Sequence, residues 1–393
     1  MGSISKSINQ LSLDLNNELR ILESDKNIAI SPASISTMLS LLLLGSRGES
    51  SAQIKKVLHI SEAQTAEKEG FGKLSAKEMK TDKVADVHNQ FHQLLLQLKS
   101  QKSDTVLTIA NAAFTQTNFP LAEEYLTSAE TLYQAKVETV DFQDDKTRQK
   151  INSWVEEKTE GKIKDFFPEG SLDKSASLVL ANAVYFKGQW KKKFNEENTK
   201  NAPFYTTKES EISVPMMSQI ERFNLGAIEE IDAQVIEIPY GSGEQSMFIL
   251  LPNEVGGLQM IEEQITAESL MKWTDNKNLH LTTVDIQLPR FKLELSYDLV
   301  PYLKHLGMVD VFSQQKANLS GISDVGLDVS QVFHKCFIEV DEEGTKAAAG
   351  TGAVIVRKSL IPPSTFKVDH PFLCFIKDNP TGTILFHVKV QSP

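Results

Sequence analysis

The chain has 393 residues, of which 40% are hydrophobic, and its formal net charge is -11 at neutral pH. Such a composition is that of a soluble globular protein with a large core, and the length alone would allow two or three domains. The acidic balance argues against a nucleic-acid partner, because proteins that bind phosphate backbones usually carry a basic excess. The Leu-rich stretch from Met38 to Leu44 is too short to span a bilayer, so no membrane partner is expected.

The first two helices are predicted from apolar spacing and capping residues. A helical stripe begins near the first residue and contains Ile4, Ile8, Leu11, Leu15, Leu19 and Leu22. Ser31 followed by Pro32 is typical of an N-cap and a first helical position, and Gly45 ends the nearly all-apolar run that follows. That second helix is therefore expected to be deeply buried.

A polar stretch and two further helices come next. Residues 61–83 are rich in Lys, Glu, Ser and Thr, which predicts a mobile charged surface loop. The next helix would place Val84, Val87, Phe91, Leu94, Leu95 and Leu98 on one side. Another is predicted to run through Ile151, Trp154, Val155 and Ile163.

Several strands are predicted in the second half of the chain. The run from Leu178 to Phe186 is apolar except for one amide, which indicates a strand buried on both faces and requires partners for Asn182. The other predicted strands are Gln234–Tyr240, Ser246–Leu251, Val284–Leu288, Val332–Val340, Phe372–Ile376 and Thr383–Val390. With no linker, repeat or break in composition, we expect residues 1–393 to form a single domain.

Two cysteines, Cys336 and Cys374, lie in apolar runs of strand character. We expect free, buried and inert thiols; a disulfide is the lesser alternative, and a metal site is disfavoured by the small number of ligands. No signal peptide is expected in the chain as given. The compartment stays open between the extracellular space and the cytoplasm.

The stretch from residue 341 to residue 359 has an unusual composition: acidic residues, then small residues, then the basic pair Arg357 and Lys358. With the period of a strand, one face carries Thr345, Ala347, Ala349, Thr351, Ala353 and Ile355, and that face could be buried. A segment that can join a sheet and ends in a trypsin-type cleavage sequence suggests a trap for a protease.

The sequence does not indicate an enzyme. It contains no Gly-x-Ser-x-Gly, His-Glu-x-x-His or Cys-x-x-Cys motif and no phosphate-binding loop. A hydrolase that used His334 or His370 would need a serine and an acid at unknown distances. We therefore expect both residues to be structural histidines.

Four stretches resemble the serpin family, and in their order they extend the resemblance over the whole chain. They are NIAISPASIS (Asn27–Ser36), LANAVYFKGQW (Leu180–Trp190), HKCFIEVDEEGT (His334–Thr345) and DHPFL (Asp369–Leu373). The resemblance implies an α+β fold of three β-sheets with about nine α-helices. It also implies an exposed reactive-centre loop near the C-terminus, at about residues 342–365.

The resemblance further implies the chemistry of that loop. Lys358 would be the bait residue and Lys358–Ser359 the bond that a protease attacks, with Arg357 as the second choice. A long cation fits a specificity pocket with an acid at its base, so the expected partner is a trypsin-like serine protease held in a covalent complex. The cleaved loop would then insert as a strand into the large sheet.

Other residues take roles from the family position by position. The hinge of the loop would be Glu342, Glu343, Gly344, Thr345, Ala347, Ala348 and Ala349. Ser31, Ser34, Asn182 and His334 would form a polar cluster under the sliding strands, called the shutter. Trp190, Glu342 and Arg290 would form the breach, the place where insertion starts, with Arg290 as the expected partner of Glu342.

The remaining expectations concern ligands and assembly. We expect no cofactor and no metal, and a monomer; the sequence gives no support for activation by a glycosaminoglycan, which stays open. The alternative to an inhibitor is a non-inhibitory serpin that acts as a carrier or chaperone. Such a member would typically have lost the hinge of small residues, which this chain retains.

Overall fold

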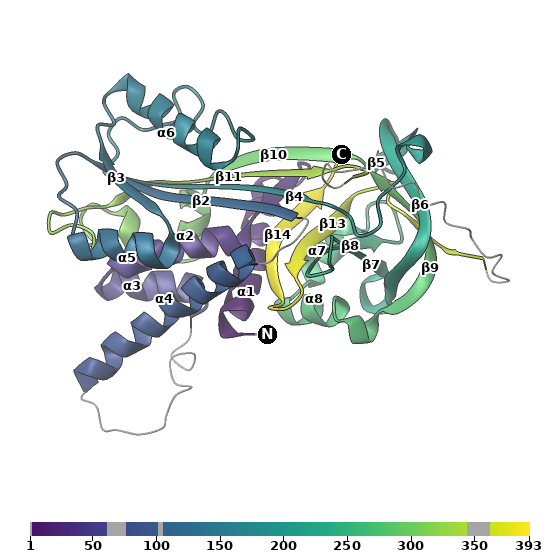
Figure 1. The fold of residues 1–393 in the computed structure, drawn as a ribbon, viewed down its shortest axis with the longest axis horizontal. Coiled ribbons are helices and arrows are strands. Elements are labelled where there is room, and N and C mark those ends of the chain that lie inside the picture. Colours follow the sequence, from purple (N-terminus) through teal and green to yellow (C-terminus); the bar gives the residue numbers. More distant parts are fainter. Residues whose placement is uncertain (1, 61–75, 101–104, 344–361) are drawn as a thin grey trace.

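The structure is a computed structural model that describes residues 2–60, 76–100, 105–343 and 362–393. These residues form nine α-helices and two β-sheets (Figure 1). The predicted α+β class is confirmed. None of the described helices is both long enough and apolar enough to cross a membrane.

The helices are α1 (Ser3–Leu22), α2 (Pro32–Gly45), α3 (Gly48–Val57), α4 (Ala76–Ser100), α5 (Glu123–Tyr133), α6 (Asp145–Lys158), α7 (Leu258–Gln264), α8 (Ala267–Trp273) and α9 (Val300–His305). Short 3-10 turns are η2 (Glu196–Asn198), η3 (Glu229–Ile231), η4 (Asn276–Asn278) and η5 (Asp310–Phe312).

The strands are β1 (Ile28–Ile30), β2 (Thr105–Gln116), β3 (Lys136–Val140), β4 (Leu178–Gly188), β5 (Lys200–Thr207), β6 (Ser210–Ile228), β7 (Ala233–Pro239), β8 (Gln245–Pro252), β9 (His280–Pro289), β10 (Phe291–Asp298), β11 (Val329–Val340), β12 (Ser364–Lys367), β13 (Phe372–Asp378) and β14 (Thr383–Val390).

Hydrogen bonding joins these strands into two sheets. The five-stranded sheet has the order β10-β11-β4-β2-β3, and the nine-stranded sheet has the order β1-β14-β13-β8-β7-β6-β9-β12, with β5 paired to β6. The family resemblance implied three sheets. The described strands form two sheets, because β6 joins two of the expected three into one. Strand β6 is 19 residues long and pairs with β5 near its start, with β9 along its middle and with β7 near its end.

The layers follow from where each sheet buries its apolar face. Helices α2 and α5 lie on one side of the five-stranded sheet and α6 lies on the other (Figure 1). The largest core cluster joins the α1–α2 side to strands of both sheets, and a smaller cluster packs α6 residues such as Ile151 and Val155 against Phe333. The five-stranded sheet is therefore covered on both faces.

The first two helices form as predicted, with one exception. In α1 the stripe residues from Ile4 to Leu19 are buried, but Leu22 is 66% exposed because the helix ends there. The Oγ atom of Ser31 caps α2 by accepting a hydrogen bond from the backbone N–H of Ser34 at 3.4 Å. Pro32 occupies the first turn and Gly45 is the last residue of the helix, so this prediction is confirmed.

Two boundary predictions are wrong. The predicted charged loop at 61–83 is too long, because α4 begins at Ala76; residues 61–75 lie outside the described residues. Ala, Lys, Glu and Met favour helices, so a polar start does not prevent one. Helix α6 ends at Lys158, and Glu160 and Gly161 follow with φ values of 53° and 75°. Ile163 is thus buried beyond the helix and not within it.

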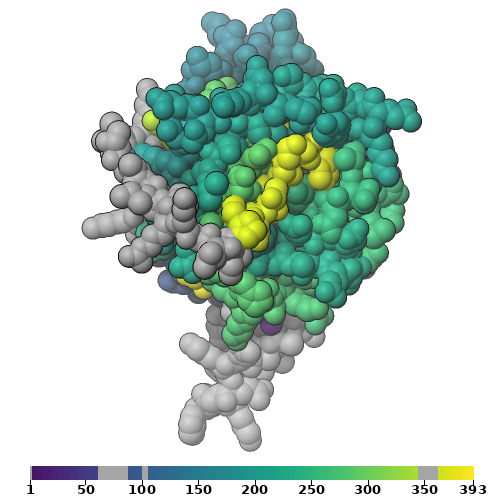
Figure 2. Space-filling model, turned by 90° about the vertical axis from the view of Figure 1, so that its right-hand side faces the viewer, coloured from purple at the N-terminus to yellow at the C-terminus, as the bar shows by residue number. Residues whose placement is uncertain are grey.

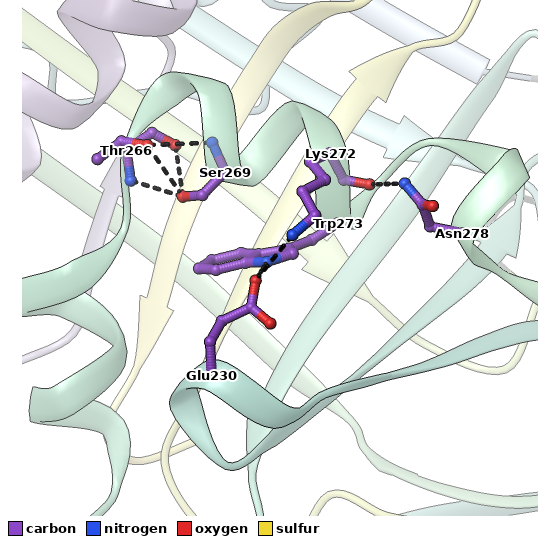
Figure 3. Close-up of polar contacts among 6 residues, drawn as sticks. All are labelled: Glu230, Thr266, Ser269, Lys272, Trp273 and Asn278. Carbon is purple, nitrogen blue, oxygen red and sulfur yellow. Dashed lines mark hydrogen bonds and ion pairs between the residues drawn. The ribbon is translucent and has the colours of Figure 1, made fainter.

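Helix α8 is fixed over the nine-stranded sheet by polar contacts (Figure 3). Thr266 and Ser269 form a reciprocal capping box at its start. At its end the indole Nε1 of Trp273 donates a hydrogen bond of 2.8 Å to Glu230 Oε1, and Lys272 Nζ lies 3.3 Å from the same oxygen. These contacts join α8 to η3, so the helix covers a defined part of the sheet.

Candidate functional site

The candidate site lies along the border between β4 and β11 in the five-stranded sheet. The two strands are parallel and directly paired, with a register that runs from Val329 opposite Leu178 to Ile338 opposite Phe186. We call this border the seam. Strand β11 ends at Val340, and the chain continues through residues 341–343 toward the predicted loop.

A neutral polar cluster lies at the middle of the seam. His334 of β11 is opposite Asn182 of β4, and the two side chains are joined by a hydrogen bond of 2.5 Å between His334 Nδ1 and Asn182 Oδ1. Asn182 Nδ2 donates to Ser34 Oγ at 2.5 Å. The structure thus brings together the four residues predicted for the shutter, since the backbone N–H of Ser31 donates to His334 Nε2 at 3.2 Å.

The hydrogen bonds determine the protonation state of His334. Its Nε2 faces a backbone N–H and must accept, so Nδ1 carries the proton and donates to Asn182. The ring is fully buried, and this desolvation lowers the pKa of His334 to about 3. A second proton would place two N–H groups against each other at Ser31, so the closed seam requires the neutral ring.

Sequence reasoning missed two contributors to the shutter. Asn182 Nδ2 also donates to Asn111 Oδ1 of β2, and Ser31 Oγ donates to the carbonyl of Leu385 at 2.7 Å. Asn111 occurs in the run Ile-Ala-Asn-Ala-Ala, which has the same single amide in an apolar strand that singled out Asn182. That repeated signature could have found Asn111, whereas nothing in the sequence indicates a backbone carbonyl.

The upper end of the seam carries charged groups. Glu342 is only 3% exposed, and its Oε1 lies 2.5 Å from Arg290 Nη2 and accepts a hydrogen bond of 2.5 Å from Thr199 Oγ1. Burial raises the pKa of the Glu342 carboxyl, but the hydrogen bonds from Arg290 and Thr199 outweigh it, so the pKa is lowered overall. Glu342 is therefore a buried carboxylate with a half-exposed counterion.

Trp190 holds the residues that follow β11. Its indole Nε1 donates to the carbonyl of Asp341 at 2.8 Å, and its backbone N–H donates to the carbonyl of Glu343 at 3.4 Å. Tyr240 stacks on the indole at 4.4 Å between ring centroids. Asp341 is in turn 3.1 Å from Lys187 Nζ. The three residues predicted for the breach thus lie together, and Thr199, Asp341 and Lys187 are additions that the sequence did not reveal.

The two cysteines and the second candidate histidine lie in closed environments. Cys336 and Cys374 are free and buried, as predicted, and burial raises the pKa of both thiols. His370 Nδ1 lies 2.8 Å from Asp369 Oδ1 and its Nε2 lies 2.7 Å from the Pro252 carbonyl. Both ring nitrogens are engaged, as expected of a structural histidine.

Several predicted site residues lie outside the described residues. These are Gly344, Thr345, Ala347, Ala348 and Ala349 of the hinge and Arg357, Lys358 and Ser359 at the bait bond. Of the predicted hinge, Glu342 and Glu343 are described: the carbonyl of Glu342 accepts a hydrogen bond from the backbone N–H of Phe194, and that of Glu343 accepts one from Trp190. The roles of all these residues in loop insertion stay predictions.

Comparison with known proteins gives one consistent family. The model of the family "Serpin (serine protease inhibitor)" matches residues 6–393. Human Serpin B4 is 43% identical and horse leukocyte elastase inhibitor is 38% identical, each over 100% of both chains. The crystal structure of uncleaved ovalbumin has a TM-score of 0.87 at 32% identity and is also covered over 100% of both chains.

These matches confirm the family resemblance and the fold, while their names give no support to a placement in the extracellular space. Together with the full-length match to the family model, they show that the chain belongs to the serpin family.

Proposed function

We propose that the protein inhibits trypsin-like serine proteases as a suicide substrate. The protease attacks the Lys358–Ser359 bond and forms an acyl-enzyme, and the freed segment inserts into the seam before the acyl-enzyme is hydrolysed. The protease supplies the chemistry and the conformational change of this chain stops it. The partner is a protease whose specificity pocket has an acid at its base, because the bait is a long cation.

The parallel pairing of β4 and β11 carries this proposal. A segment that follows β11 and folds back runs antiparallel to β11, and hence antiparallel to β4 as well. It can therefore form ladders with both strands once they part. Each new hydrogen bond contributes roughly 0.5–1.5 kcal/mol net, so a dozen or so give on the order of 10 kcal/mol, enough to distort a bound active site.

The side chains of the seam fit an opening that starts at one end. The Glu342 and Trp190 contacts hold the residues directly after β11, so they are the first that insertion must rearrange. The His334–Asn182 bond crosses the middle of the seam and must break for a strand to pass. The same contacts keep the seam closed until a protease cleaves the chain.

The small residues of the predicted hinge are consistent with this route. Thr345, Ala347 and Ala349 share the strand face that would turn inward. A long or charged side chain on that face would have to pass between the parting strands and should stall insertion. Lys346 lies on the opposite face and should be tolerated.

Incubation with trypsin followed by a denaturing gel tests the proposal. We expect a covalent complex that resists boiling in detergent, together with a small C-terminal fragment that begins at Ser359. Mass measurement of that fragment separates cleavage after Lys358 from cleavage after Arg357, and Lys358→Ala should abolish the complex in the first case. Cleavage of the wild-type chain without any complex would favour the carrier or chaperone alternative.

A further inference from the structure

One face of the nine-stranded sheet is covered over part of its width and open over the rest. Helices α7 and α8 cover β7, β8 and β13, where Val235, Phe248 and Phe375 belong to one core cluster with Leu258 and Trp273. The cross-strand register carries the same face across β6 to β9 and β12, beyond the helices. Figure 2 views this side, where yellow C-terminal residues lie at the surface among green and teal segments.

The uncovered part presents aliphatic side chains to solvent. Opposite pairs on this face are Ile220 with Asp285 and Asn224 with Leu281, while Ile220 is 44% and Leu281 is 54% exposed. We define the open sheet face by Ile220, Arg222, Leu281, Thr283, Asp285 and Thr365. Exposed apolar side chains gathered on one surface often mark an interaction site.

A cation lies between the two aliphatic residues. Arg222 is exposed and is paired across the strands with Thr283. The cross-strand pair that contains Ile220 lies on one side of it, and the pair that contains Leu281 lies on the other. Within the part of the chain that the structure describes, its guanidinium forms no ion pair, whereas the neighbouring Glu221 is paired with Lys192 at 3.5 Å. The face thus presents a cation beside two exposed aliphatic side chains, with Asp285 in the row of Ile220, and it suits a partner carboxylate that has apolar groups next to it.

The chain length between this face and the bait limits what can occupy it. Ser364, the first residue of β12, is six residues after Lys358. Six residues span about 20 Å at most. A globular protease domain of about 220 residues has a radius of gyration of about 17 Å, so its body must lie close to β12 while its active site holds Lys358.

We propose that the open sheet face is a second contact surface for the protease that is bound at the bait bond. It recognises a carboxylate flanked by apolar side chains on the protease surface, outside the active site. Contacts there raise the rate of association and select among proteases that accept the same bait. This inference rests on the proposed function, but it concerns the encounter with the protease and not the insertion step.

Binding to inactive proteases tests the surface separately from inhibition. The variant combines Arg222→Glu, Ile220→Ser and Leu281→Ser, and the control combines Lys316→Glu with Val325→Ser, where Val325 is also 44% exposed. Trypsin, thrombin and plasmin with the catalytic serine replaced by alanine serve as probes. We expect the open-face variant to bind at least one of them at least tenfold more weakly, measured as Kd, and the control to bind all three like the wild-type chain.

The active forms of the same proteases provide the second readout. The association rate of the variant should fall by the same factor, with an unchanged number of inhibitor molecules consumed per protease. The inference would be overturned if the open-face variant bound all three inactive proteases with the Kd of the wild-type chain. It would also be overturned if the control variant bound them as weakly as the open-face variant. An absence of covalent complexes for the wild-type chain would instead contradict the proposed function, so the two failures are distinguishable.

Discussion

The middle and the upper end of the seam close the same pair of strands by different means. The middle uses neutral groups that are fully buried, with His334 and Asn182 at its centre. The end uses a buried carboxylate, Glu342, with the half-exposed cation Arg290. The comparison teaches that two paired strands can be joined by hydrogen bonds where solvent is excluded and by an ion pair where solvent enters.

The largest expected effect comes from the middle. Replacement of Asn182 by Leu leaves hydrogen-bonding groups of His334, Ser34 and Asn111 buried without their partner. We expect a loss of about 4 kcal/mol, because each orphaned buried group costs about 1–3 kcal/mol. Urea unfolding measures it, and Asn16→Leu is the control, because the Asn16 amide is equally buried but has no hydrogen-bond partner within the described residues. Equal losses of unfolding free energy in the two variants would mean that the shutter hydrogen bonds do not stabilise the fold more than any other buried amide does.

The end of the seam should cost less to break. Glu342→Gln keeps the shape but removes the charge that faces Arg290, and solvent screens this half-exposed pair. We therefore expect a loss of about 1–2 kcal/mol. Glu342→Lys, which places two cations together, should destabilise further and favour polymers, visible by native gel electrophoresis after mild heating. Unchanged stability and an unchanged monomer in Glu342→Lys would refute the role of this contact.

Acid should lower the stability of the folded chain through protonation of His334, in the middle of the seam. The pKa of His334 is about 3 in the folded chain but near 6.5 in an unfolded one, so the unfolded state binds more protons between these values. Stability then falls as the pH drops from about 6.5 toward 3, by about 1.4 kcal/mol per pH unit for this group. Burial also lowers the pKa values of His88 and His387, which add to the slope. His334→Gln should reduce the slope measured by urea unfolding at several pH values; an unchanged slope would show that His334 takes up no proton on unfolding.

Salt should change the stability contributed by the upper end of the seam but not that contributed by the middle, and this is the smallest of the expected effects. Raising NaCl to about 1 M shortens the screening length to about 3 Å, which weakens partly exposed ion pairs. The stability difference between the wild-type chain and Glu342→Gln should shrink by a few tenths of a kcal/mol. The difference between the wild-type chain and Asn182→Leu should not change. A salt dependence of equal size in both would remove the distinction between neutral and charged closure.

Much of the fold follows from local signals. The capping of α2 by Ser31 and the burial of β4 on both faces are read from residue types and spacing alone. Strand β6 was missed because polar residues alternate irregularly along it, and its role depends on pairing with three different strands. Gly161 signals the end of α6, because glycine with a positive φ commonly follows a helix; the positive φ of Glu160 has no such sequence signature.

The site was predictable where polar residues interrupt apolar runs or match a family motif. Asn182 and His334 were identified in this way, and the structure places them opposite each other. Thr199 was not identifiable, because it lies in a polar stretch and contacts Glu342 only through the tertiary fold. The open sheet face was equally hidden, since exposure of Ile220 and Leu281 depends on where α7 and α8 end.

Insertion of the cleaved segment into the seam is tested most directly by one pair of variants. Thr345→Arg puts a long cation on the face that would turn inward, and Ala348→Arg puts the same side chain on the opposite face. After incubation with trypsin, a denaturing gel should show cleavage of Thr345→Arg without a covalent complex, while Ala348→Arg forms the complex like the wild-type chain. A covalent complex of Thr345→Arg in the wild-type amount would contradict insertion between β4 and β11.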